Sequence, residues 1–142
     1  MLVASALVGG VVLSQLIFSK PIVSSMTLVS DYFQVYGEDK STIVTSLSFD
    51  EMLLGMSVSE TVNLKNIGDE TIDAAWSSTN LPSGVTMAVE YVQGGVAYPW
   101  NPNDYGLDMI PPNGYMSVII TLTNVSGSEG VYPFTLTFMG TT

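Results

Sequence analysis

The chain has 142 residues, of which thirteen are acidic and three are lysines, and it contains no Arg, His or Cys, so its formal net charge is −10. Nucleic acid and anionic lipid headgroups bind basic surfaces, and we therefore expect neither as a partner. The usual general bases, thiol nucleophiles and zinc ligands are missing, which predicts a protein that is not an enzyme and needs no cofactor. Charged residues make up only 11% of the chain, against about 25% in typical soluble domains, and this favours an extracellular or assembled protein.

The first eighteen residues, MLVASALVGGVVLSQLIF, carry no charge. Their apolar residues fall on every side of a helix, and such a helix must be surrounded by lipid or by protein. The segment lacks the alternation of a strand with one wet face, so we expect a helix; Gly9-Gly10 weakens a helix, and a Val-rich strand is the alternative. We predict an assembly segment over residues 1–20, buried through Leu2, Val3, Leu7, Val8, Val11, Val12, Leu13, Leu16, Ile17 and Phe18.

Residues 21–142 change to short alternating runs separated by Gly, Pro, Asn and Asp. In one of these runs Val118, Ile120 and Leu122 alternate with Ser117, Ile119 and Thr121, as in a strand with one buried face. Seven such strands predict one mainly β domain, an antiparallel β-sandwich of immunoglobulin-like or jelly-roll type. The candidate strands are Ser25–Tyr36, Ser41–Phe49, Val58–Asn66, Thr71–Ser77, Thr86–Val92, Tyr115–Thr123 and Tyr132–Phe138.

The stretch from Gly94 to Gly114 is the longest irregular one expected, and long Pro-rich loops are often functional. Its aromatic residues Tyr98, Trp100 and Tyr105 form a candidate contact surface for a neighbouring molecule, or they plug one end of the sandwich. Calcium is the one metal that a chain with these ligands permits, because it binds carboxylate and carbonyl oxygens. Asn103, Asp104 and Asp108 are weak calcium candidates, and otherwise we expect no metal.

Asn124-Val125-Ser126 matches the N-glycosylation sequon, which makes Asn124 a candidate glycosylation site. The paired acids Glu38-Asp39, Asp50-Glu51 and Asp69-Glu70 fall in expected turns, where solvated charge is the default interpretation.

The charge-free apolar N-terminus, followed by an acidic β-sandwich rich in Ser and Thr, resembles an archaeal type IV pilin, the arrangement also seen in archaeal flagellins. The phrase Val62-Asn63-Leu64-Lys65-Asn66-Ile67-Gly68 is similar to a strand ending found in that family. The resemblance implies an extracellular homopolymer in which N-terminal helices form the filament core and β domains form its outer surface. It also implies adhesion to surfaces, cells or other filaments, as in a biofilm. The family's helix usually continues further than Lys20-Pro21 allows here.

The run LGMSVSETVNLKNIGDETI from Leu54 to Ile72, with the closing GVYPFTLTF, is similar to TasA and camelysin-like fibre proteins and to archaeal bundling pili. That resemblance implies assembly in which the N-terminal strand of one subunit completes the sheet of the next. Both resemblances predict an extracellular filament subunit, and they differ in the state of the N-terminal segment. A membrane-anchored β-sandwich binding module is the third alternative, in which that segment spans lipid.

Overall fold

The computed structural model of the chain describes residues 22–30, 33–105, 109–126 and 130–141. This part of the chain is mainly β, forms two five-stranded sheets and contains no helix, so the expected fold class is confirmed at that level. The predicted assembly residues from Leu2 to Phe18, and with them the predicted N-terminal helix, lie outside the described residues. No helix in the described ranges has the length and apolar character needed to cross a membrane.

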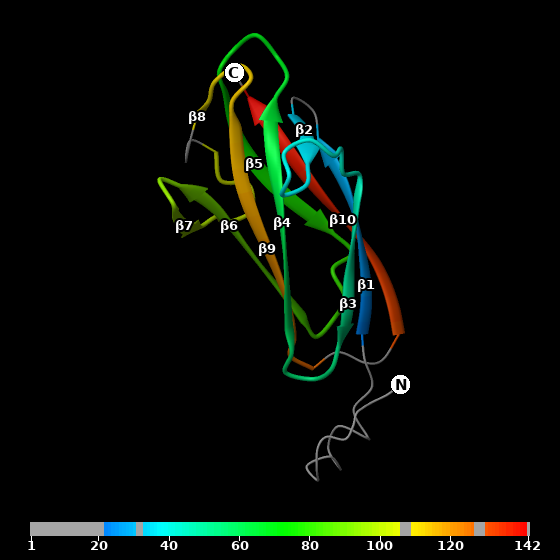
Figure 1. Cartoon of the computed structure of the whole chain (residues 1–142). Coiled ribbons are helices and arrows are strands. Elements are labelled where there is room, and N and C mark those ends of the chain that lie inside the picture. Colours follow the sequence, from blue (N-terminus) through cyan, green and yellow to red (C-terminus); the bar gives the residue numbers. More distant parts are fainter. Residues whose placement is uncertain (1–21, 31–32, 106–108, 127–129, 142) are drawn as a thin grey trace.

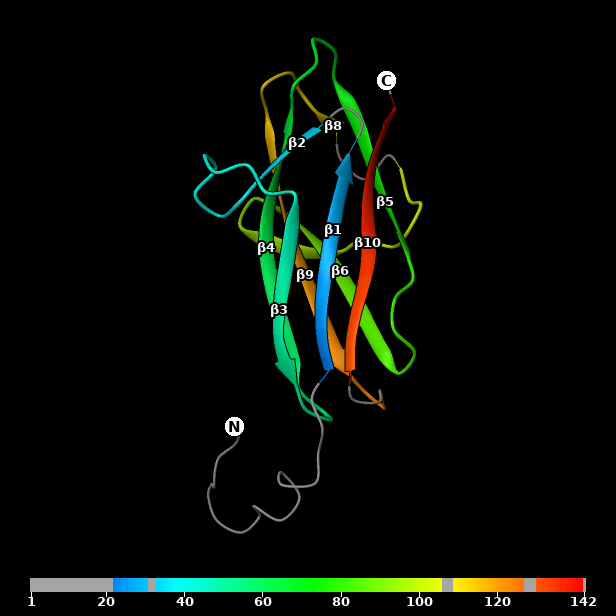
Figure 2. The same cartoon turned by 90° about the vertical axis from the view of Figure 1, so that its right-hand side faces the viewer.

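The first sheet, sheet A, has the strand order β3–β1–β10–β5–β8. Its strands are β1 (Ile22–Ser30), β3 (Ser46–Met52), β5 (Ile72–Thr79), β8 (Met109–Ile110) and β10 (Gly130–Thr141). β1 is antiparallel to β3 and parallel to β10, and Figure 2 shows it between these two strands. Sheet A is therefore mixed, which corrects the expectation that the sandwich is antiparallel throughout. The first strand of the described chain therefore occupies an interior position of sheet A.

The second sheet, sheet B, has the order β2–β4–β9–β6–β7, and all of its neighbouring strands are antiparallel. Its strands are β2 (Phe33–Tyr36), β4 (Ser57–Asn66), β6 (Val85–Gln93), β7 (Val96–Pro99) and β9 (Tyr115–Asn124). Figure 1 shows β4 and β9 as the long central pair of this sheet.

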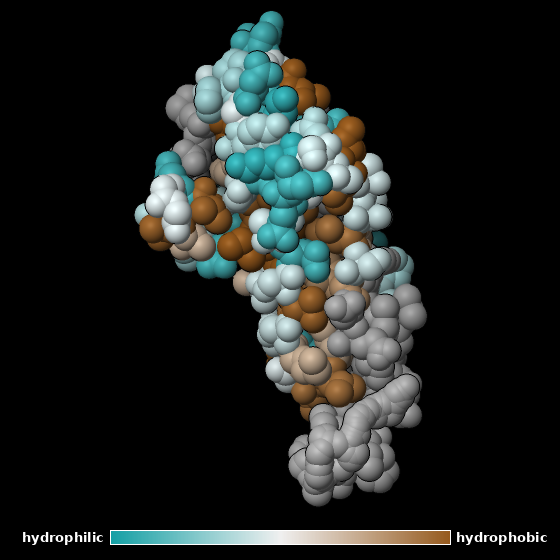
Figure 3. Space-filling view, in the orientation of Figure 1, coloured by the Kyte–Doolittle hydropathy of each residue, from teal (hydrophilic) through white to brown (hydrophobic). Residues whose placement is uncertain are grey.

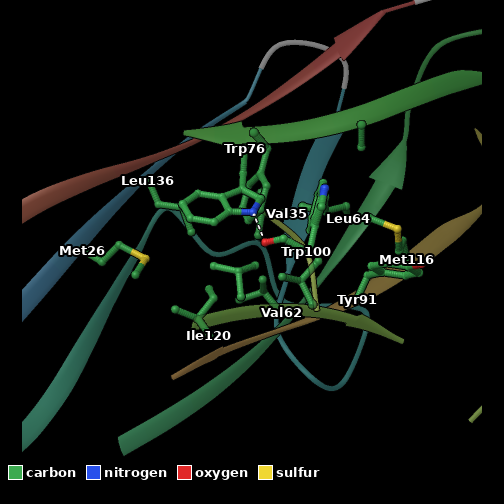
Figure 4. Packing of buried hydrophobic residues seen from close by; sticks show 14 of the residues in the cluster. Met26, Val35, Val62, Leu64, Trp76, Tyr91, Trp100, Met116, Ile120 and Leu136 are labelled. Atoms are coloured by element: carbon green, nitrogen blue, oxygen red, sulfur yellow. Dashed lines mark hydrogen bonds between the residues drawn. The ribbon is translucent and has the colours of Figure 1, made fainter. Parts of the chain in front are cut away.

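The core lies between the two sheets, where the alternating residues of the long strands point inward (Figure 4). In β9 the side chains of Val118, Ile120 and Leu122 are buried, as their spacing predicts, and those of Met116 and Asn124 continue the same face. β10 contributes Phe134, Leu136 and Phe138 in the same way. The period of two thus correctly identifies the inner face of both strands.

The structure corrects the predicted single strand Ser25–Tyr36, because the chain passes from sheet A to sheet B between Ser30 and Phe33. Ser30 and Asp31 favour a turn, but no Gly or Pro stands beside them, so the turn signal at this crossing is weak. The predicted strand Ser41–Phe49 begins later, at Ser46. β7 and β8 lie within the stretch expected to be irregular and were not predicted.

Trp100 lies inside the sandwich and is only 2% exposed, which corrects its assignment to a contact surface. Its carbonyl accepts a hydrogen bond from the indole N–H of Trp76 at 2.8 Å (Figure 4), and its ring lies 6.3 Å from that of Phe138. The backbone N–H of Trp100 donates to the carbonyl of Val89 in β6. The backbone N–H of Asn103 donates to the carbonyl of Trp76 in β5. The loop thus ties sheet B to sheet A, and Trp100 plugs the space between them.

Tyr98 and Tyr105, the other two aromatic residues of this stretch, are 41% and 43% exposed. The ring of Tyr98 stacks on that of Tyr91 with the centroids 5.5 Å apart. A contact role for these two tyrosines stays a prediction.

Candidate assembly surface at the base of the sandwich

One end of the sandwich, here called the base, is formed by the start of β1, the turn between β3 and β4, and the end of β9 (Figure 1). Ile22, the first residue of β1, pairs with Met52 at the end of β3. The carbonyl of Met52 in turn accepts a hydrogen bond of 2.9 Å from Nδ2 of Asn124, the last residue of β9. These contacts bring the start of the described chain next to two segments that are distant in sequence.

The turn between β3 and β4 is held by Asn124. The Asn124 carbonyl accepts a hydrogen bond from the N–H of Gly55 at 2.7 Å, and its own N–H donates to the carbonyl of Met56 at 2.9 Å. Gly55 has a φ of 85°, a conformation that residues with a Cβ rarely adopt. Backbone and side chain of one buried asparagine therefore fix the path of the turn.

Three apolar side chains on this fixed backbone face solvent: Leu54 is 55% exposed, Met56 44% and Val125 56%. We call these three residues the base rim. Figure 3 shows hydrophobic surface at this end of the described body. Single exposed apolar residues are common, but several of them gathered around one point mark a contact site more often. The base rim thus lies at the end of the sandwich where β1 begins, two to four residues after Met52, the partner of Ile22, and next to Asn124.

The environment of Asn124 contradicts its assignment as a glycosylation site. The side chain is fully buried and its Nδ2, the atom that would carry a glycan, donates to the carbonyl of Met52. Attaching a sugar at this atom would force a bulky polar group into the core. The sequon is therefore better explained by the need for an asparagine at the end of β9.

Two of the three calcium candidates, Asn103 and Asp104, lie in the described residues, and their role as calcium ligands stays a prediction. Asn103 lies in the left-handed region with a φ of 60°, and the carbonyl of Asp104 accepts a hydrogen bond of 3.1 Å from the indole N–H of Trp100. Asp108 lies outside the described residues. Within the ranges described, no three or more acidic side chains are grouped so as to hold a metal ion.

The base rim was not predicted from the sequence, because Leu54 and Met56 lie in a turn and follow neither a helical nor a strand period. A signal was nevertheless present in a repeated phrase. Leu64-Lys65-Asn66-Ile67 and Leu122-Thr123-Asn124-Val125 both end a strand with a buried asparagine followed by an exposed branched residue. The repeat would have indicated that Asn124 has a structural role and that Val125 lies outside the core.

A scan of the chain against protein-family models and a comparison with curated proteins both found no match.

Proposed function

We propose that this protein is a structural subunit of an extracellular filament, of the pilus type. Subunits polymerise through the apolar segment of residues 1–18, and the β-sandwich forms the outer surface, which adheres to surfaces, cells or other filaments. The partners are identical subunits in a helical homopolymer, without nucleic acid. The role is mechanical and adhesive, with neither catalysis nor a cofactor.

The observation that carries this proposal is the base rim at the end of the sandwich where β1 begins. Leu54, Met56 and Val125 are exposed at the end where the chain enters from a segment of eighteen uncharged residues. An apolar segment and an apolar rim at one end of a subunit both favour contacts that exclude water. Burying about 1,000 Å² of apolar surface of the segment corresponds to about 25 kcal/mol before the entropic cost of association.

A second mode of assembly, by strand donation, is favoured by the position of β1. This strand lies between β3 and β10 and contributes Met26, which is fully buried, to the core. If β1 of one subunit were supplied to the sheet of the next, the same pairing would link subunits into a fibre. The product is again an extracellular filament, with a strand instead of a helix as the link.

The decisive experiment uses the full-length chain extracted without detergent. Filaments that pellet intact and are visible by negative stain support the proposal, whereas a monomer that needs detergent supports a membrane-anchored module instead. The circular dichroism of the filaments then distinguishes the two modes. Helix at about 13% of residues is expected for a helical core of 18 residues out of 142, and a spectrum of pure β type is expected for strand donation.

A variant lacking residues 1–19 provides the matched control. Under the helical mode it remains a soluble, folded β monomer, because β1 begins only at Ile22. Loss of the helical signal together with loss of filaments is the expected result. Persistent filaments in this variant would refute a role for the apolar segment in assembly.

A further inference from the structure

Two of the three lysines of the chain converge on one tyrosine ring. The Nζ of Lys40 lies 5.5 Å from the centroid of the Tyr115 ring, and the Nζ of Lys65 lies 5.6 Å from it. Lys65 and Tyr115 are cross-strand partners in β4 and β9, while Lys40 comes from the turn after β2. We call Lys40, Lys65 and Tyr115 the lysine–tyrosine patch.

Several features hold the lysine–tyrosine patch in place. The turn that carries Lys40 is closed by the Asp39 carboxylate, which accepts hydrogen bonds from the N–H groups of Ser41 and Thr42 and from the Thr42 hydroxyl. The Asp39 carboxylate is therefore occupied within its own turn. On the other side the ring of Tyr36 lies 6.2 Å from that of Tyr115. Both lysines therefore lie over a Tyr115 ring that also contacts Tyr36.

The patch concentrates positive charge on a very acidic protein. Lys40 and Lys65 are the only cationic side chains in the described ranges, and Tyr115 between them is 40% exposed. Two ammonium groups beside one ring repel each other, and the ring offsets this repulsion only in part, with about 0.5–1 kcal/mol for each exposed cation–π contact. A carboxylate placed at the patch would be attracted by both lysines, so the patch is complementary to an acidic surface.

The chain itself carries such a surface at the same end of the sandwich. Asp69 and Glu70 are adjacent and exposed in the turn between β4 and β5, which lies opposite the base in Figure 1. The turn is fixed by Asn66, whose Nδ2 donates to the carbonyl of Glu70 at 2.7 Å and whose Oδ1 accepts from the N–H of Gly68 at 2.9 Å. A fixed turn presents its two carboxylates with little loss of entropy on contact.

We propose that the lysine–tyrosine patch of one subunit binds the Asp69-Glu70 turn of a second copy of this chain. This inference rests on the filament function proposed above, and it adds a specific contact between the β-sandwiches of neighbouring subunits. Subunits standing side by side at similar height bring this end of each sandwich together, so the patch of one copy meets the turn of the next. Two ammonium groups then face two carboxylates, which offsets locally the repulsion between subunits of net charge −10.

Cross-linking of mixed filaments tests the contact directly. Full-length chains with and without ¹⁵N are mixed before assembly, and the filaments are treated with a carbodiimide, which joins a lysine amine to a carboxylate in contact with it. We expect linked peptides between Lys40 or Lys65 of one label and Asp69 or Glu70 of the other. Linked peptides that always carry the same label would show that the links form within one chain. That result, links to other carboxylates, or no links in intact filaments would overturn the inference. A failure of the wild-type chain to form filaments would instead overturn the proposed function.

A pair of charge-matched variants measures the energetic role of the patch. Lys40→Gln/Lys65→Gln and Thr79→Glu/Thr86→Glu both take the net charge from −10 to −12, and Thr79 and Thr86 are exposed threonines outside the patch. We expect the lysine variant to dissociate from filaments at a clearly lower temperature than the threonine variant. The difference between the two dissociation temperatures should become smaller in about 1 M salt, where the Debye length falls to about 3 Å. Equal dissociation temperatures of the two variants would refute the role of the patch.

Discussion

Asn66 and Asn124 occupy opposite ends of the same antiparallel strand pair, each as the last residue of its strand and each fully buried. Asn66 donates its Nδ2 to the carbonyls of Glu70 and Ile110, and Asn124 donates its Nδ2 to that of Met52. A buried amide that pairs with backbone carbonyls replaces the hydrogen bonds that these carbonyls lose with water. The two asparagines therefore fix the turns at both ends of the β4–β9 pair.

Replacing Asn124 by Ala should lower the free energy of unfolding by about 1–3 kcal/mol, because the buried carbonyl of Met52 loses its donor. Asn101→Ala, at an exposed position, is the matched control and should change stability by less than about 0.5 kcal/mol. Denaturant titration of both variants gives the comparison. Equal stability of the two would show that the Asn124 side chain does not hold the base.

Replacing Trp100 should lower the free energy of unfolding more than replacing Asn124 does. Trp100→Ala removes a large side chain that is 2% exposed, and such truncations in a core typically cost about 3–5 kcal/mol. Tyr105→Ala, in the same stretch but at a 43% exposed residue, should cost little. Thermal melting of the two variants distinguishes a plug from a surface loop. A small loss at Trp100 would mean that the loop is held by its backbone hydrogen bonds alone.

Leu54→Asp should impair filament assembly while leaving the fold intact, because it places a charge in the base rim at a side chain that is 55% exposed. Val96→Asp introduces the same charge at a residue with 51% exposure, in β7, outside both the base rim and the lysine–tyrosine patch. Pelleting of filaments from the two variants, with circular dichroism as the check on folding, gives the result. If both variants pellet to a similar extent, the base rim is not part of the assembly surface.

The turn that carries Lys40 has a defined pH dependence. The Thr42 hydroxyl, followed by the N–H groups of Ser41 and Thr42, donates hydrogen bonds to Asp39 and holds the pKa of that carboxyl well below its usual range. A carboxyl with a depressed pKa in the folded state stabilises the fold above its unfolded pKa of about 3.9. This contribution is lost as the pH falls below about 3.9 and through the folded pKa.

NMR titration of the Asp39 carboxyl tests this prediction. Thr42→Val removes the largest of the three hydrogen-bond effects and should raise the Asp39 pKa toward its ordinary value. Ser41→Ala keeps the backbone donor of residue 41 and should change the pKa less. An Asp39 pKa that is unchanged by Thr42→Val would show that the hydroxyl does not bind the carboxylate in solution.

The strands of the sandwich could be predicted from the sequence wherever one face of the strand is buried and the other is exposed to solvent. The alternation of Phe134, Leu136 and Phe138 with threonines identifies both the strand and its inner face, because side chains alternate across a sheet with a period of two. The turn residues between the runs were equally informative, since Gly55, Gly84, Gly94 and Gly95 all adopt positive φ values.

The exposure of individual aromatic and polar residues could not be obtained in the same way. Trp100 and Tyr105 lie in one irregular stretch, yet only Trp100 enters the core, because Val89 and Trp76 from two different sheets receive and hold it. Asn124 has the sequence of a glycosylation site and the environment of a core residue. In both cases the deciding neighbours are far away in the chain.

Composition and local periodicity by themselves determined an acidic β domain that follows a charge-free apolar segment. Only the tertiary structure decided that β1 enters sheet A parallel to β10, that Leu54 and Val125 are both exposed at the base, and that two lysines lie over the ring of Tyr115. The physical reason is that strand periodicity reports which face of a strand is buried but not which strand lies beside it. Pairing between distant segments depends on the packing of the whole sandwich, and the candidate surfaces of this protein are formed by such pairs.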